Sequence, residues 1–267
     1  MKKTINSKNN ICVSPMDFKP CQHYEAVVCD LDGTLLHSQK EAIAVQGRTM
    51  NSFLGEKSAH LLAEISKIFP VVIATGRNAV STDKMVKQLI KAKKVKFSGF
   101  VLENGFVIKK NLADKIVHND KWDKIAELFP DWERLPFYEN CVGFIPPSLN
   151  QEKMAGIAEK KLKDNGYTDL VYKEKRKLFI YPGSVDKMRG LSLLGVHPYI
   201  AMGDQTNDIS MIKNSTWPVI INSDISELKE IVKEKNGFCS LLTSHEAAQE
   251  MLSFAYEKIK IRFDQWN

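Results

Sequence analysis

Two carboxylates spaced two residues apart, Asp30 and Asp32, follow a short apolar run at 26–29 of the type that forms a buried strand. Gly33 comes directly after them and indicates a sharp turn. Open α/β sheets bind ligands outside the carboxyl ends of their strands, so this stretch lies where such a sheet builds a site. Aspartate is a weak nucleophile, but it can accept a phosphoryl group and divide one difficult displacement into two easier ones.

Phosphoryl transfer to an aspartate also needs a cation and a second acid. Mg²⁺ suits the first task, and Asp204, at the end of a later strand, and Asp208, one helical turn further on, are candidate ligands beside Asp30. Asp32 is the candidate acid that protonates the leaving group, because at i+2 it can project to the same side as Asp30. Its pKa would have to be raised, as happens when two carboxylates share a site.

Hydrogen-bond donors and a fixed positive charge must hold the transferring oxygens. Thr75 and Gly76 follow the second apolar strand and can supply a hydroxyl group and backbone N–H groups. Lys187, near the start of a later helix, can supply the charge. Asn207 can orient the site or cap a helix.

Arg77 and Asn104 are candidates for contacts with the substrate, since each follows a predicted strand directly or after a short turn. Structural hydrogen bonding of the loops explains these two residues equally well. The sequence leaves both interpretations open.

Strands and helices that alternate along the chain must position these residues. The predicted strands lie at 25–29, 71–74, 99–102, 199–202 and 219–221, and apart from Glu25 each is an uninterrupted apolar run. The predicted helices cover 58–67, 79–91, 187–194, 207–213, 225–234 and 245–262. This alternation indicates an α/β fold with a parallel sheet that is covered on both faces.

The pattern changes between Gly105 and Gly183. Shorter strands are predicted there at 106–108, 115–117, 141–145, 170–173 and 177–181, with helices at 121–129 and 150–164. We therefore predict a Rossmann-like core at 25–104 and 184–267, an inserted α+β cap domain at 105–183, and an N-terminal extension at 1–24. The stretch at 37–56 has no clear pattern.

Composition restricts the classes of partner and compartment. The chain has 267 residues and a net charge of +6 that is spread along it, so we expect no nucleic-acid binding. Its five cysteines contain no Cys-x-x-Cys pair, which argues against a disulfide framework or a zinc site and for a reducing cytoplasm. No apolar run approaches the roughly 18 residues of a membrane-spanning helix, so we expect no membrane partner. Nothing in the sequence specifies an oligomeric state.

The order of these motifs resembles that of the haloacid dehalogenase (HAD) superfamily. The four motifs correspond to Asp30–Leu35, Ala74–Arg77, Lys187 and Gly203–Asp208. The insertion after Glu103–Gly105 is similar to the cap of the Cof-type subfamily IIB, which includes sugar-phosphate phosphatases and phosphomannomutases. The resemblance covers nearly the whole chain beyond residue 24.

What the resemblance implies is a Mg²⁺-dependent enzyme that forms an aspartyl-phosphate intermediate. Asp30 would be the nucleophile and a metal ligand. Asp32 would be the general acid and base, with its backbone carbonyl on the metal. The chain departs from the family pattern in three respects. Met188 follows Lys187 where glycine is usual, and only 17 positions separate Lys187 from Asp204, fewer than in the family. The stretch from Ser38 to Glu56 is longer than the family's usual link to the first helix.

We expect a phosphomonoester hydrolase that acts on a small phosphorylated metabolite, in particular a sugar phosphate. The alternatives are a phosphomutase of the phosphomannomutase type and a sensor that binds a phosphorylated ligand without turnover. The cap should select the substrate. Its aromatic residues Trp122, Trp132, Tyr138 and Phe144 either stack on a sugar or form the cap's own core, and the second interpretation is favoured. The basic residues at 175–177 either face the site or lie in a solvated turn.

Overall fold

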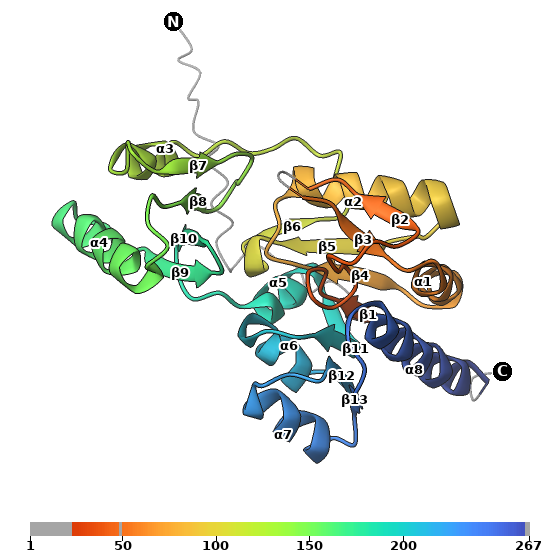
Figure 1. Cartoon of the computed structure of the whole chain (residues 1–267). Helices are drawn as coiled ribbons and strands as arrows, with labels where there is room; N and C mark the ends of the chain where they lie inside the picture. The colour runs from red at the N-terminus through yellow and green to blue at the C-terminus, as the bar shows by residue number, and fades with distance from the viewer. Residues whose placement is uncertain (1–22, 48–49, 265–267) are drawn as a thin grey trace, which may run out of the picture.

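The computed structural model describes residues 23–47 and 50–264, so the predicted extension at 1–24 falls almost wholly outside the described residues. Figure 1 shows a large sheet with helices on both faces and a smaller sheet beside it with its own two helices. The large sheet is mostly parallel, which confirms the predicted α/β fold class.

The large sheet has the strand order β13-β12-β11-β1-β4-β5-β6, and only the β5–β6 pair is antiparallel. Its strands are β1 (Tyr24–Cys29), β4 (Val71–Ala74), β5 (Gly99–Leu102), β6 (Val107–Lys109), β11 (Val196–Gly203), β12 (Trp217–Ile221) and β13 (Phe238–Ser240). From β1 the chain adds strands on one side through β4 and β5, and later on the other side through β11 and β12. The order reverses between β1 and β11, which is where open α/β sheets bind their ligands.

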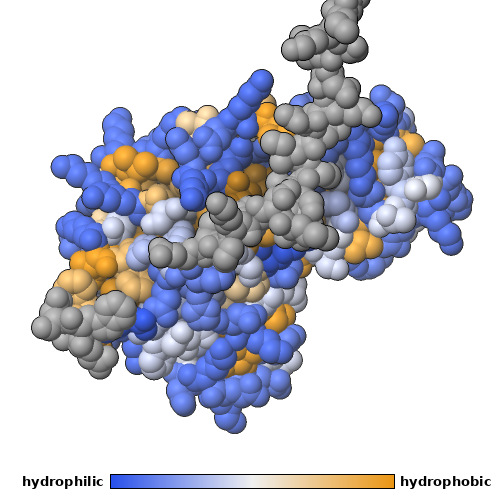
Figure 2. All heavy atoms as spheres, turned by 180° about the vertical axis from the view of Figure 1, so that it is seen from behind, coloured by the Kyte–Doolittle hydropathy of each residue, from blue (hydrophilic) through white to orange (hydrophobic). Residues whose placement is uncertain are grey.

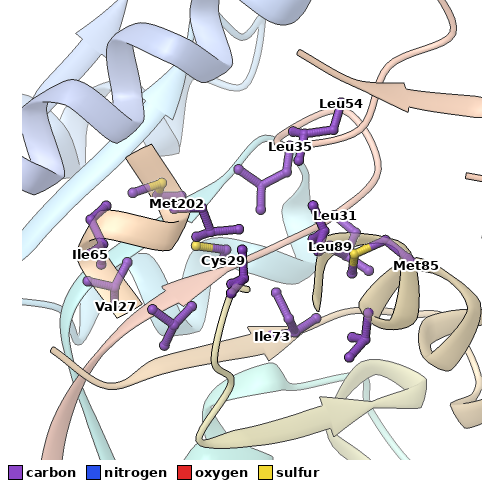
Figure 3. Packing of buried hydrophobic residues seen from close by; sticks show 14 of the residues in the cluster. Val27, Cys29, Leu31, Leu35, Leu54, Ile65, Ile73, Met85, Leu89 and Met202 are labelled. Carbon is purple, nitrogen blue, oxygen red and sulfur yellow. The ribbon is translucent and has the colours of Figure 1, made fainter. Parts of the chain in front are cut away.

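Strand β1 is buried on both faces, which explains its uninterrupted apolar sequence. Val27 and Cys29 point into one hydrophobic cluster, while Ala26 and Val28 point into the other. Figure 3 shows the first cluster, where Val27 and Cys29 lie close to Ile65 and Met202. Because β1 is buried on both faces, the position of its end at Cys29 is fixed. Asp30 follows directly after it.

Helices cover the two faces of the large sheet. They are α1 (Glu56–Ile68), α2 (Ala79–Lys93), α5 (Lys187–Leu194), α6 (Ile209–Lys213), α7 (Ser226–Glu234) and α8 (Ser244–Asp264). Each coincides with a predicted helix, except that the one predicted at 207–213 divides into a 3₁₀ turn at Thr206–Asp208 and the short α6. The unassigned stretch at 37–56 contains a two-stranded sheet of β2 (Ile43–Val45) and β3 (Ser52–Leu54).

The smaller sheet is antiparallel, with the order β7-β8-β10-β9. Its elements are α3 (Asp120–Glu127), β7 (Glu133–Leu135), β8 (Val142–Ile145), α4 (Gln151–Asp164), β9 (Leu170–Glu174) and β10 (Lys177–Tyr181). We call this unit the small layer. Alternate residues of β10 face opposite ways: Leu178 and Ile180 belong to the clusters that also contain residues of α3 and α4, and Phe179 and Tyr181 form a separate aromatic cluster.

Two predictions for the inserted segment were wrong. The strand expected at 115–117 is absent, since the described residues 113–119 carry no strand, and β7 appears instead at a position for which no strand was predicted. Strand β6 was placed in the insertion but pairs with β5 in the large sheet. Strands of three residues are too short for a periodic signal. The division of the chain into domains at residue 105 stays a prediction.

Glu103 and Asn104 form the joint between β5 and the small layer, and both adopt a positive φ. The Glu103 carboxylate is fully buried and accepts hydrogen bonds from the backbone N–H groups of Glu139 and Asn140, each at 2.9 Å. The backbone N–H of Asp186 donates to the Asn104 carbonyl at 3.1 Å. The segments before and after the small layer are therefore bonded to each other at this joint.

Replacing Glu103 with Gln should flatten the pH dependence of stability. Burial raises the pKa of Glu103 to about 7, against about 4.3 in an unfolded chain. Between these values the folded state binds more protons, so its free energy of unfolding falls as pH rises, by about 3 kcal/mol across the window. Urea unfolding at pH 5 and pH 8 measures the effect, with the exposed Glu227→Gln as control. An unchanged slope in the Glu103 variant would contradict this assignment.

The surface in the view of Figure 2 is mostly hydrophilic, with apolar residues in small groups. Among the described residues, every helix is too short or too polar to cross a membrane.

Candidate active site

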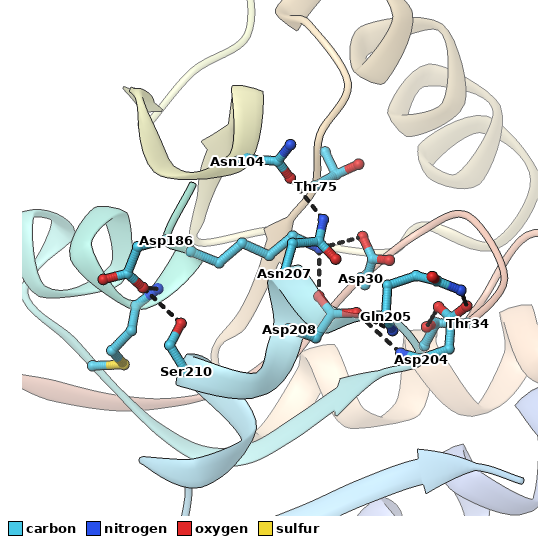
Figure 4. Close-up of polar contacts among 12 residues, drawn as sticks. Asp30, Thr34, Thr75, Asn104, Asp186, Asp204, Gln205, Asn207, Asp208 and Ser210 are labelled. Atoms are coloured by element: carbon cyan, nitrogen blue, oxygen red, sulfur yellow. Dashed lines mark hydrogen bonds and ion pairs between the residues drawn. The ribbon is translucent and has the colours of Figure 1, made fainter. Parts of the chain in front are cut away.

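Strands β1, β4, β5 and β11 end at the same edge of the large sheet, and a polar residue follows each of them there. These residues are Asp30, Thr75, Asn104 and Asp204. Figure 4 shows them around Asn207 and Asp208, which come from the 3₁₀ turn after β11. The structure thus brings together residues from distant parts of the sequence, as the parallel-sheet interpretation predicts.

Lys187 is the central cation of the site and has no exposed surface. Its Nζ lies 2.8 Å from Oδ1 of Asp30 and 2.5 Å from Oδ1 of Asp208. Burial alone would lower the pKa of Lys187, but the two carboxylates outweigh it and raise that pKa, so the side chain stays charged. Lys187 is the first residue of α5, whose N-cap Asp186 accepts from the backbone N–H of Met188 at 2.9 Å. This N-cap fixes the first residue of α5 and therefore the position of Lys187.

Asp208 holds both this lysine and the loop that precedes it. Its Oδ2 accepts from the backbone N–H groups of Asp204 and Gln205, each at 3.0 Å, and the residue is fully buried. A side chain on Gly203 would place its Cβ 2.5 Å from the Asp208 carboxyl carbon, so only glycine fits there. Because both Asp208 oxygens are already engaged, its contacts favour a positioning role.

Asp204 is held by two side chains that the sequence analysis did not single out as site residues. Thr34 Oγ1 donates to its Oδ1 at 2.8 Å, and Gln205 Nε2 donates to its Oδ2 at 2.7 Å. Thr34 and Gln205 lie inside the two motifs at Asp30–Leu35 and Gly203–Asp208. A threonine or a glutamine at these positions does not by itself predict a hydrogen bond to Asp204. A Cβ on Gly33, which has φ +90°, would lie 2.4 Å from the Asp204 carboxylate. The glycine is therefore needed for the Asp30 loop to approach Asp204.

The carboxylates of Asp30, Asp204 and Asp208 form a compact acidic cluster, with ligand oxygens within 4.8 Å of one another. Burial raises the pKa of Asp30, and the charges of Asp208 and Asp204 raise it further against the opposing charge of Lys187. Three buried carboxylates beside one lysine leave excess negative charge. An all-oxygen donor set of this kind fits a hard divalent cation such as Mg²⁺.

Asp32 lies outside this cluster. Its two oxygens accept from Nε and Nη2 of Arg77, both at 2.6 Å, and its side chain is 46% exposed. The contact with Arg77 removes part of the carboxylate from water, which opposes ionisation, but the hydrogen bonds and charge of Arg77 outweigh this effect and lower the pKa of Asp32. The raised pKa expected from two carboxylates at one site is thus not found, because Arg77 and not Asp30 is the immediate neighbour of Asp32.

The remaining predicted residues take different places. Thr75 is buried, and its Oγ1 accepts a hydrogen bond from the backbone N–H of Arg77 at 3.2 Å. Gly76 therefore lies between two residues that are hydrogen-bonded to each other. Asn207 Nδ2 donates to Oδ1 of Asn104 at 2.8 Å, and Asn104 Nδ2 donates to the Tyr181 hydroxyl of the small layer at 3.1 Å. These bonds explain Asn104 and Asn207 as links between the site and the small layer.

Most of the candidate aromatic residues of the small layer pack among themselves. Phe144 contacts Trp132 edge to face at 5.7 Å between ring centroids, and Trp122 is buried in the same cluster. Tyr138 instead packs against Phe179, on the side of the aromatic cluster. All four rings therefore pack in hydrophobic clusters of the small layer, as the interpretation of these residues as core predicts.

The basic turn at 175–177 acts electrostatically on the site. The charges of Lys177 and Lys175 are near enough to contribute to the lowered pKa of Asp32, after its burial and Arg77. Lys177 also lies 3.4 Å from Glu174. The positive charges of the turn between β9 and β10 thus act on Asp32.

A second group of ligand-type side chains, His118, Asp120 and Asp123, lies exposed around the start of α3. Arg134 is 2.7 Å from Asp123 and already pairs with it. This group is separate from the acidic cluster.

This chain is similar to a known protein family and to a named phosphatase. The family of haloacid dehalogenase-like hydrolases matches residues 27–130 and 139–236. Phosphoglycolate phosphatase 1 of Saccharolobus solfataricus is 24% identical over 176 residues, covering 62% of this chain and 72% of that protein.

Solved structures share the fold at low identity. A haloacid dehalogenase-like hydrolase from Bacteroides thetaiotaomicron matches with a TM-score of 0.65 and 16% identity, over 88% of this chain and 99% of its own. The sucrose-phosphatase of Synechocystis, solved with sucrose and phosphate, matches with a TM-score of 0.53 and 15% identity, over 89% and 99% of the two chains.

The family match includes the motifs that carry the site. Its first stretch contains Asp30, Asp32 and Thr75, and its second contains Lys187, Asp204 and Asp208. The predicted resemblance is thereby confirmed, together with the prediction of a hydrolytic enzyme. The chain belongs to the haloacid dehalogenase-like hydrolase family.

Proposed function

We propose that this protein is a Mg²⁺-dependent phosphatase that hydrolyses a small phosphorylated metabolite through an aspartyl phosphate on Asp30. The observation that carries the proposal is the Asp30 carboxylate, held at 2.8 Å by the buried Lys187 beside two further carboxylates, at the switch point of the sheet. A nucleophile fixed next to a lysine and a cation site meets the needs of phosphoryl transfer. Bound Mg²⁺ would offset the negative charge of the carboxylates and of the phosphate.

In the proposed reaction, an oxygen of Asp30 forms a bond to phosphorus while the bond from phosphorus to the ester oxygen breaks. Asp32 gives its proton to the leaving alkoxide. In the second step Asp32 takes a proton from water, which attacks phosphorus and releases inorganic phosphate and free Asp30. Lys187 keeps Asp30 oriented, and the Thr75 hydroxyl and nearby backbone N–H groups hold phosphate oxygens.

Asp32, the proposed acid, must break its hydrogen bonds with Arg77 before it can donate a proton. In the bidentate pair Asp32 is ionised and acts as an acceptor only, because a carboxylate in this state has no proton to donate. Substrate binding would have to draw Arg77 away, for which an anionic phosphate is a suitable competing partner. Arg77 therefore sets the fraction of enzyme in which Asp32 carries a proton.

Replacing Arg77 with Ala should move the alkaline limb of the kcat/KM profile to higher pH for alkyl phosphates. Without the guanidinium the pKa of Asp32 rises, so the protonated acid persists to higher pH. Aryl phosphates with good leaving groups need little protonation, and their profile should shift less. The partly exposed Arg134→Ala is the matched control. A profile that stays in place for both ester types would argue against Asp32 as the acid.

A sugar phosphate is the proposed class of substrate. Its support is the shared fold with the sucrose-phosphatase of Synechocystis and with a trehalose-6-phosphate phosphatase related protein. The relative in Saccharolobus is named for phosphoglycolate, a smaller phosphate ester. We propose that the small layer is the cap that selects among such esters, since the Tyr181 hydroxyl of its strand β10 lies 3.1 Å from Nδ2 of Asn104 at the edge of the site.

A screen of phosphorylated metabolites tests the proposal. Purified protein with Mg²⁺ should release phosphate from at least one sugar phosphate, and chelation of the metal should stop the release. Conversion between a sugar 1-phosphate and 6-phosphate without free phosphate would point to a mutase instead. Ligand-induced thermal stabilisation without any turnover would point to a sensor.

A further inference from the structure

Three buried polar atoms without hydrogen-bond partners gather at a second place, away from the acidic cluster. They are His37 Nε2, His245 Nδ1 and Ser58 Oγ. The rings of His37 and His245 have centroids 5.1 Å apart, and a Cβ on Gly55 would lie 3.7 Å from Ser58 Oγ and 4.0 Å from His245 Nδ1. The place lies where the chain after the Asp30 loop meets the first turns of α1 and α8.

The other nitrogen of each histidine is already committed as a donor. His245 Nε2 lies 2.8 Å from the Gln39 carbonyl oxygen, which can only accept. The His37 ring bonds the Thr34 backbone, and because its Nε2 has no partner, Nδ1 makes that bond. The second nitrogen of each ring is therefore buried without a hydrogen bond and is free to accept one or to bind a cation.

Buried lone pairs without a donor carry a desolvation cost, which a bound cation would remove. Histidines that bind metals usually donate their second nitrogen to a carbonyl or carboxylate, which fixes the tautomer, and both rings show this arrangement. Two imidazoles on one tetrahedral ion, with metal–nitrogen distances of roughly 2.0–2.1 Å, have ring centroids roughly 5 Å apart. The observed separation of 5.1 Å at an interplanar angle of 84° agrees with this.

We propose that His37 and His245 form a binding site for a divalent transition-metal ion such as Zn²⁺, with Ser58 and solvent completing its coordination. Imidazole favours zinc, nickel and copper, whereas the acidic cluster offers oxygens only, so the two sites differ in the metals they select. The absence of Cys-x-x-Cys pairs argued against a zinc site, but that criterion does not detect two histidines distant in sequence. This inference does not depend on the proposed phosphatase activity.

The ion would tie three parts of the chain together. His37 is bonded to Thr34, whose hydroxyl donates to Asp204, and Gln39 and His245 connect the chain after the Asp30 loop with α8. Ser58 lies in the first turn of α1. We assign the ion a structural function, namely holding the Asp30 loop against α1 and α8.

Zn²⁺ titration of the full-length protein by calorimetry tests the site, with Mg²⁺ in large excess to occupy the acidic cluster. Wild type should bind one equivalent and gain thermal stability. His245→Gln and His37→Gln should each lose affinity by more than about tenfold. The matched controls are His60→Gln, an exposed histidine on α1, and His118→Gln in the exposed group around α3; both should bind as wild type does. Unchanged affinity in the His245 and His37 variants would overturn the proposal.

X-ray absorption of the zinc-loaded wild-type protein gives a test that needs no variant to fold. The expected first shell contains two imidazole nitrogens together with oxygen ligands. A shell of oxygens alone would place the zinc in the acidic cluster and overturn the proposal. A high-resolution crystal structure grown with Zn²⁺ that shows only a water molecule between the two rings would do the same.

Discussion

Replacing Asp30 with Asn should reduce phosphate release by at least about ten-thousandfold, the loss typical of removing an enzyme's nucleophile. Asn is close in size to Asp and keeps one acceptor oxygen, but its amide cannot form the acyl phosphate. Phosphate release from the best ester of the screen, measured with saturating Mg²⁺, gives the ratio to wild type. Denaturation of wild type with radiolabelled substrate should trap label on the protein, and the variant should trap none.

The matched control for this substitution is Asp224→Asn, an exposed carboxylate after β12. Like Asp30→Asn, it removes one negative charge, but it should leave the rate of phosphate release within a factor of about two, as expected for a surface substitution. An Asp30 variant with the rate of wild type, in a protein whose melting temperature is unchanged, would remove Asp30 from the mechanism.

Replacing Lys187 with Met should lower the free energy of unfolding by about 3–5 kcal/mol, because it leaves buried carboxylates without their counter-charge. Lys187 has no exposed surface and contacts both Asp30 and Asp208. Urea unfolding at neutral pH measures the loss. Added Mg²⁺ should stabilise the variant more than wild type, since the ion would then be the only cation in the acidic cluster.

A double variant separates lost charge from lost packing. Lys187→Met combined with Asp208→Asn removes a lysine and a carboxylate, so it should be more stable than the sum of the two single effects by about 1–3 kcal/mol. Lys229→Met, an exposed lysine on α7, is the control and should have little effect. Strict additivity in the double variant would contradict the ion pair as the source of the loss.

The sequence predicted the main sheet and the place of the site because both follow from simple rules. Uninterrupted apolar runs such as 26–29, followed by turn signals, favour strands buried on both faces, and parallel strands end at a common edge. Asp30 and Asp204 therefore had to meet. Lys187 could be placed from its helix start, even with Met188 in the position of the usual glycine.

The partner of Asp32 could not be predicted in the same way. Spacing at i+2 fixes the side of the chain from which the carboxylate projects, but not which neighbour it meets. Arg77 lies beyond a different strand, and its reach depends on the turns at Gly33 and Gly76 and on its own side-chain torsions. Charge partners across loops depend on tertiary geometry, for which a single sequence has no periodic signal.

Short edge strands were the other source of error. β7 and β13 have three residues each, too few for alternation to stand out from a loop. The strand predicted at 115–117 is the opposite error. The apolar pattern of these residues is typical of a strand, but no strand of the described residues pairs with them. A strand at a sheet edge depends on its partner as much as on its own residues.

The bonded joint at Glu103 and Asn104 has a consequence for how such enzymes diversify. Because the N–H of Asp186 donates to the carbonyl of Asn104, the stretch between them enters and leaves at adjacent points, and its part beyond β6 can be exchanged by recombination while β6 keeps its place beside β5. A transplanted stretch would have to preserve two anchor points, the Tyr181 hydroxyl that meets Asn104 and the backbone N–H groups that meet Glu103. Under the proposed function, new specificities could be grafted in this way onto an unchanged catalytic sheet.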